Sequence, residues 1–285
     1  NNSITKFLFK GIFLLTLFSG NKAQADDTMC YDPLNVKSEG AAGTICANKL
    51  IVDRALLNEG IAAGKTGTHD STFKITLPNG NTYNFKHQVF TGQVQDFSNL
   101  FKDAKSFNAP IGGWDTSNAT KMNGMFFGAE TFNQDIGSWD VGKVKNMGSI
   151  FRNAKVFNKP LANWDVSSVT NMRSMFHGAT NFNQEINDWG SKTGKVTNMR
   201  SMFQSAVSFN KHIQTWDVSN VTTMMNMFYK AEDFNKTLNK WSTESSTAKV
   251  KSMQRMFKDA TSFNNGSLNA LRLDVSNVED LREMF

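Results

Sequence analysis

Hydrophobic residues recur along this chain with a period of about 25 residues, and Asn, Gly, Ser and Lys separate them. Segments 132–154 and 157–179 carry the same order of apolar and polar positions, and that order can be followed from Val94 to Phe285. A period of this length is typical of stacked supersecondary units, because one such unit cannot bury its apolar face alone. The sequence therefore predicts a stack of coils around one continuous core.

The order of residues within a coil predicts two elements. The consensus is V-T-x-M-x-x-M-F-x-x-A-x-x-F-N-x-x-I-x-x-W-D-V-S-N. Its apolar positions from Val to Ala are spaced by three and four residues, which predicts a short helix that a preceding Thr or Ser caps. The Ile-x-x-Trp-Asp-Val stretch alternates and is rich in β-forming residues, so it predicts a short strand. The expected fold class is an α/β solenoid with one short strand and one short helix in each coil.

Two aromatic rows are assigned to the core. All Trp residues lie in one row, which favours burial over a role as a platform for stacking bases or sugars. The predicted core rows comprise Trp114, Trp139, Trp164, Trp189, Trp216, Trp241, Phe126, Phe151, Phe176, Phe203, Phe228 and Phe257. Two insertions, WGSKTGKV and WSTESSTAKV, fall between Trp and Val. We expect the chain to turn outside the stack at these places.

Residues 1–25 have the features of a secretory signal peptide. Lys6 and Lys10 precede a short apolar run, and the triplet Ala-Gln-Ala ends at Ala25, after which cleavage is predicted. The apolar run is shorter than the roughly 20 residues that cross a bilayer, so no membrane span is predicted in the mature fragment. In an exported chain, Cys30 and Cys46 are expected to form a disulfide.

Residues 26–90 precede the repeat region, which we assign to 91–285 with a truncated last repeat. Segment 48–64 has helical apolar spacing, and segment 73–85 predicts a β-hairpin with Asn79-Gly80 in its turn. Because a stack of repeats needs a cap with a polar outer face, we interpret 26–90 as a small α+β cap. A separate small binding module is the alternative interpretation.

Two polar rows also recur once in each coil. The Asn that follows the second Phe is expected to bond backbone groups at each bend. The Asp that follows Trp, as in Asp115, Asp140, Asp165 and Asp217, is expected to cap a helix or stabilise a turn. The alternative is a bound Ca²⁺ between stacked carboxylates, although Gly190 and Ser242 interrupt the row.

Charge and motifs exclude several classes of function. Removing Lys6, Lys10 and Lys22 of the signal segment from the 31 basic residues leaves 28, against 25 acidic residues. So mild an excess without a basic cluster argues against nucleic-acid binding. None of the 4 His lies in a metalloprotease motif, and no nucleophile elbow, P-loop or dinucleotide fingerprint is present. We therefore predict no catalysis, no catalytic residue, no cofactor and no metal site, and we expect His177 and His212 to be exposed.

The segments WDVSSVTNMRSMF and WDVSNVTTMMNMF resemble the 25-residue units of the BspA-like leucine-rich-repeat bacterial surface proteins. The resemblance covers residues 94–285, although Met, Phe and Trp stand here where Leu is usual. It implies a leucine-rich-repeat-like solenoid, secreted or displayed on the cell surface, that acts in adhesion or other contact with proteins or glycoproteins of other cells or matrix. It implies no catalytic residue.

Three functions remain open at this stage: a protein-binding scaffold, a passive surface array or spacer, and a Ca²⁺-stabilised adhesin. Polar residues beside each Trp vary from coil to coil, which favours the scaffold because a solenoid can vary its surface without changing its core. The candidate binding face consists of Asp115, Asp140, Asp165, Asp188, Gln214, Asp217 and Lys240.

Overall fold

The computed structural model describes residues 50–52, 54–55, 57–58, 75–76, 82–83, 89–243, 247–267 and 270–285. Its elements are short: β1 (Leu50–Ile51), β2 (Ile75–Thr76), β3 (Thr82–Tyr83), β4 (Val89–Phe90), η2 (Asn187–Lys195), α2 (Lys240–Thr243) and η3 (Asn265–Ser267). The predicted signal segment and the predicted Cys30–Cys46 disulfide lie outside the described residues. In the described part of the chain, no helix is both long and apolar enough to cross a bilayer.

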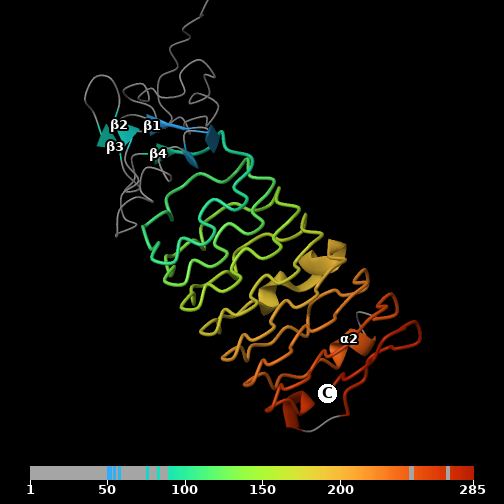
Figure 1. The fold of residues 1–285 in the computed structure, drawn as a ribbon. Coiled ribbons are helices and arrows are strands. Elements are labelled where there is room, and N and C mark those ends of the chain that lie inside the picture. Colours follow the sequence, from blue (N-terminus) through green and yellow to red (C-terminus); the bar gives the residue numbers. More distant parts are fainter. Residues whose placement is uncertain are drawn as a thin grey trace, which may run out of the picture.

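Residues from about 91 onward wind through successive coils that lie side by side (Figure 1). One residue of each coil forms an isolated parallel β-bridge with the same position of the next coil. The bridges run in sequence through Asp96, Lys121, Asn146, Asn171, Asn198, Thr223, Ser252 and Asp280. Each of these bridge residues immediately precedes the first large apolar residue of its coil, so this edge of the stack is a continuous parallel ladder.

After each bridge residue, the backbone amides alternate between two kinds of partner. In one coil, the amides of Met147, Ser149 and Phe151 donate to carbonyls of the next coil at 2.8–3.0 Å. The amides of Ile150 and Arg152, which follow Ser149 and Phe151, donate instead to carbonyls three residues earlier, at 3.2 and 3.1 Å. The same alternation recurs in the other coils, and it satisfies buried backbone donors that a lone coil would leave unpaired.

The helix predicted from Val to Ala of each coil is wrong. That segment is a succession of turns, and its backbone has φ +58° at Ser149 and φ +58° at Asn153. Positive φ at the third residue of a bonded four-residue turn is the geometry of a type II turn, and a right-handed helix does not contain it. The spacing of three residues misled the prediction, because consecutive turns produce the same spacing as a helix. The positions equivalent to Ser149 and Asn153 in the preceding coil are Gly124 and Gly128, and glycine adopts positive φ most readily.

The strand predicted at Ile-x-x-Trp-Asp-Val is also not observed in the described coils. Residues 136–141 contain a turn closed by the Trp139 amide, which donates to the Ile136 carbonyl at 3.1 Å. The β-bridge lies a few residues later, at Asn146. The alternation of apolar residues here reflects a bend around bulky side chains rather than an extended strand.

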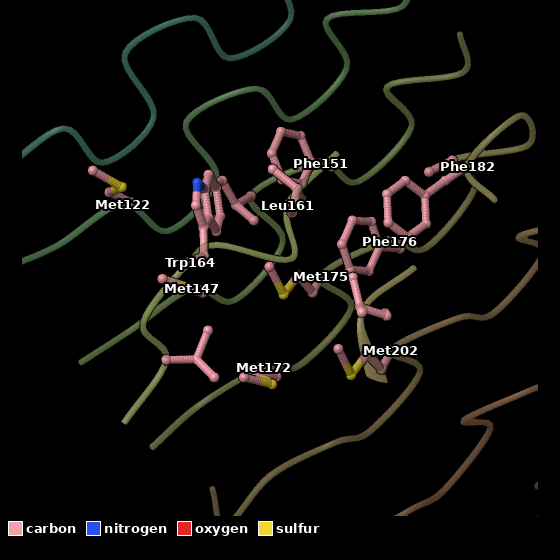
Figure 2. Packing of buried hydrophobic residues seen from close by; sticks show 14 of the residues in the cluster. Met122, Met147, Phe151, Leu161, Trp164, Met172, Met175, Phe176, Phe182 and Met202 are labelled. Atoms are coloured by element: carbon pink, nitrogen blue, oxygen red, sulfur yellow. The ribbon is translucent and has the colours of Figure 1, made fainter. Parts of the chain in front are cut away.

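The interior is filled by buried Met, Phe, Leu and Trp side chains that recur at the same positions of successive coils (Figure 2). Phe151 and Phe176, from neighbouring coils, stack with ring centroids 5.6 Å apart, and Phe151 also stacks on Phe157 of its own coil at 4.1 Å. Trp164 is fully buried, and its indole N–H donates to the carbonyl of Ile136 in the preceding coil at 3.1 Å. The remaining Trp and Phe residues of the predicted core rows are at most 6% exposed. Each column therefore continues from coil to coil without a polar interruption.

The insertions between Trp and Val form short helical segments. All residues of WGSKTGKV except Val196 lie in η2, and WSTESSTAKV begins in α2. The irregular stretch that follows Phe263 contains η3, where Gly266 has φ +75°. The bridge ladder continues past all three segments, so the extra residues leave the register of the stack unchanged.

The N-terminal elements meet the first coil through β1 and β4, which pair in parallel. Leu50 and Ile51 are therefore a strand, although the sequence predicted that the helix began before them; residues 54, 55, 57 and 58 are helical. Within the segment predicted as a hairpin, β2 and β3 pair antiparallel, with Ile75 opposite Tyr83.

Arg54 occupies the place that a preceding coil would take. Its guanidinium donates from Nη1 to the carbonyl of Asp96 at 2.6 Å and from Nη2 to the carbonyl of Ser98 at 2.7 Å. The equivalent carbonyls of the next coil, those of Lys121 and Asn123, accept backbone amides at 2.9 Å. One side chain thus satisfies two acceptors at the open end of the ladder.

Candidate binding surfaces

The face that the sequence favoured lies beside the Trp column, and we call it the Trp flank. Its residues are Asp115, Asp140, Asp165, Asp188, Gln214, Asp217 and Lys240. Asp140, Asp165 and Asp188 are exposed, and the others are half-buried. The residues come from successive coils, and each lies within two positions of a Trp of the buried column.

The Asp residues of the Trp flank stabilise turns. One carboxylate oxygen of Asp140 accepts the amide of Gly142 at 2.9 Å, and Asp165 accepts the amide of Ser167 at 3.1 Å. Asp115 and Asp217 make the same contact, each with the amide two residues later, at 2.9 Å. This is the turn-stabilising role that the sequence analysis preferred. Across the part of the chain that the structure describes, no group of three or more His, Cys, Asp or Glu residues is placed to hold a metal ion.

The Asn row forms a second structural ladder, as the sequence predicted. The side-chain oxygen of Asn133 accepts the backbone amide of Asn158 at 3.0 Å, and Asn158 does the same for Asn183 at 3.0 Å. The contact repeats through Asn210, Asn235 and Asn264. Because each amide oxygen is engaged by the next coil, this row belongs to the framework of the stack.

A different surface lies along the parallel bridges, and the sequence analysis did not single it out. We call it the ladder face, and it comprises the bridge residues of three central coils with the side chains two and six positions later. Its polar members are Asn146, Arg152, Asn171, Arg173, His177, Asn198, Arg200 and Gln204. All are exposed or half-buried, whereas the Met and Phe residues between them are fully buried.

The ladder face carries positive charge without acidic residues. Segments 145–158, 170–183 and 197–210, which form this side of the three coils, contain no Asp or Glu. They contain Lys145, Arg152, Lys155, Arg173 and Arg200. Among the described residues, the guanidinium groups of Arg173 and Arg200 form no ion pair or hydrogen bond, whereas Arg255 and Arg282 nearer the end of the stack each contact an acid at 2.9 Å.

His177 lies on the ladder face and is half-buried, so the expectation that it is exposed is wrong; His212 is exposed as expected. Burial, together with the positive charge of Arg152, lowers the pKa of His177 from its ordinary value to about 4. Because His177 is neutral at physiological pH, the positive charge of the ladder face comes from Arg and Lys residues. The sequence could have indicated the ladder face, since the segment NMRSMF occurs twice and places an Arg at the same position of two neighbouring coils.

The ladder, the buried columns and the period of the coils define a repeat protein. The chain matches the family described as "Mycoplasma protein of unknown function, DUF285" over residues 79–189, 158–247 and 190–285. Together these matches span residues 79–285, more than two thirds of the chain, and the chain belongs to this repeat family. The chain matches no curated protein and no solved structure.

Proposed function

We propose that this protein is a binding scaffold, exported and either secreted or displayed on the cell surface, that contacts proteins or glycoproteins of other cells or matrix without catalysis. We also propose that its stack is a leucine-rich-repeat-like solenoid and that, within its repeat family, it is similar to the BspA-like surface proteins. The signal-like segment 1–25 and the repeat pattern support these proposals.

One observation carries the proposed function. Side chains at fixed positions fill the interior, whereas positions outside the columns vary between coils. Ala162 and Asn163 of one coil correspond to Asn187 and Asp188 of the next, and none of these four is buried. Such an arrangement allows the surface to change chemistry while the core stays constant, which is what a binding surface requires.

The test is saturable binding of the purified, labelled protein to intact cells and to their extracted surface proteins. A flank variant, Asn163→Lys with Asp188→Lys, changes the exposed residue directly before Trp in two neighbouring coils, at Asp188 of the Trp flank and at its equivalent in the preceding coil. The matched control, Asn181→Lys with Asp233→Lys, makes the same chemical changes at exposed positions that directly precede a buried Phe rather than a Trp. We expect saturable binding that the flank variant weakens and the control variant retains.

The passive-array alternative predicts a different outcome. Under it, the protein shows no saturable binding to any cell or surface extract, and neither variant differs from the parent protein. That result would remove the scaffold function. If the parent protein binds and the flank variant binds equally well, the scaffold function stands and the Trp flank is excluded as its binding face.

A further inference from the structure

We propose that the ladder face binds an acidic polypeptide segment, with Arg173 and Arg200 as the main contacts and Arg152 of the preceding coil as a further contact. This inference rests on the scaffold function proposed above. It adds to the Trp flank a second binding surface, which takes an acidic segment.

Arg173 and Arg200 are adjacent and have no acidic counter-ion in the part of the chain that the structure describes. The amide of Ser174, next to Arg173, donates to the carbonyl of Arg200 at 2.8 Å, so the two residues are neighbours across the ladder. Neighbouring strands lie about 4.8 Å apart, and like charges placed opposite one another on such strands destabilise the pair. Both side chains are exposed, and their guanidinium groups contact no acid among the described residues. An anionic partner would relieve this repulsion.

Arg152, on the coil before that of Arg173, is held in place near His177 of the ladder face. Its guanidinium lies over the ring of Phe127, with 5.3 Å from its central carbon to the ring centroid. In addition, its Nε atom is buried without a hydrogen-bond partner among the described atoms. A stacked guanidinium loses less freedom on binding a carboxylate than a mobile one, because its orientation is already fixed.

Acidic residues are absent from the ladder segments of the three central coils. Asp165, Glu185, Asp188 and Asp217 all lie outside segments 145–158, 170–183 and 197–210. The ladder face therefore presents one sign of charge, which attracts acidic partners and repels basic ones.

The chemistry of the neighbouring side chains favours a polypeptide over other polyanions. Arginine matches the geometry of carboxylates through two parallel N–H donors. The bridge residues Asn146, Asn171 and Asn198 add side-chain amides, which can both donate to and accept from peptide groups. In an extended peptide, alternate side chains point to the same face, so acidic residues at every second position can meet the arginines together.

The experiment measures binding of a fluorescein-labelled dodecapeptide of alternating Glu and Ser to the full protein by fluorescence anisotropy. The variant Arg173→Gln with Arg200→Gln removes the two exposed charges of the ladder face. The control, Lys192→Gln with Lys195→Gln, removes the same charge from exposed positions in η2. A peptide with Gln in place of Glu, a heparin fragment and duplex DNA complete the set of probes.

We expect the acidic peptide to bind the parent protein and the lysine variant within twofold of one another, and the arginine variant at least tenfold more weakly. Binding should weaken between about 50 and about 500 mM salt, because salt screens exposed charges. Equal weakening in both variants, or no peptide binding, would overturn the inference. So would tighter, arginine-dependent binding of heparin or DNA, which would assign the face to another polyanion. The scaffold function is tested separately, by binding to cell-surface proteins. The scaffold function and the inference about the ladder face can therefore fail independently.

Discussion

Whether the substitution Gly128→Ala raises or lowers stability tests whether the backbone after each bridge residue consists of turns. Gly128 has φ +70° and is buried, and a Cβ added there would lie 2.5 Å from the side-chain Oδ1 and 3.3 Å from the Cα of Asp103. A residue with a Cβ in the left-handed region costs roughly 1–2 kcal/mol, and the contact with Asp103 adds to that cost. Gly128→Ala should therefore destabilise the protein. If the segment were the helix that the spacing suggested, the same change would stabilise it by about 1 kcal/mol.

Thermal melting followed by tryptophan fluorescence measures this change in stability, because every Trp side chain is at most 6% exposed in the folded protein. For a domain of this size, about 1–2 kcal/mol corresponds to a fall of about 2–8 °C in the melting temperature. Ser205→Gly is the control at an equivalent position, where φ is +55°. Removing its Cβ relieves strain but increases the freedom of the unfolded chain, so stability should stay the same or rise by up to about 1 kcal/mol. A higher melting temperature for Gly128→Ala would refute the turn assignment.

Three further predictions follow from single features of the stack. Arg54→Ala should lower the free energy of unfolding by about 2 kcal/mol, because two backbone acceptors at the end of the ladder lose charged donors. The control, Arg272→Ala at an exposed position, should change the free energy of unfolding by less than about 0.5 kcal/mol. Urea denaturation measures both changes. Since the pKa of His177 is lowered to about 4, the neutral form is favoured by folding, and stability should be lost as pH falls from about 6.5 toward 4. His177→Gln should reduce that loss in melts recorded across this pH range, and an unchanged pH profile would contradict the cause we assign. Because the Asp row accepts backbone amides, a chelator should leave the melting temperature unchanged; a fall on chelation that added Ca²⁺ reverses would instead support the Ca²⁺-stabilised adhesin.

The sequence by itself determined which side chains form the columns and where the chain can carry extra residues. Trp164 and Phe151 could be placed in one coil pattern because large apolar residues recur at a constant spacing, and burying them requires neighbours with the same spacing. The Asn ladder was also predictable, since an amide side chain that repeats once per coil has an unpaired backbone amide within reach. The insertions at η2 and α2 were located correctly because only residues outside the columns can change number without breaking the register.

The tertiary structure alone decided the backbone path and the surfaces. A spacing of three residues is common to helices and to consecutive turns, so φ at Ser149 and Asn153, and not the pattern, excludes the helix. The position of the bridge at Asn146 depends on hydrogen bonds to another coil, which no local propensity encodes. Arg54 meets the carbonyls of residues more than 40 positions away. The ladder face exists only because stacking sets Arg173 beside Arg200, which are 27 residues apart in the chain. Hydrophobic spacing is a local property of the sequence, whereas pairing between coils is not.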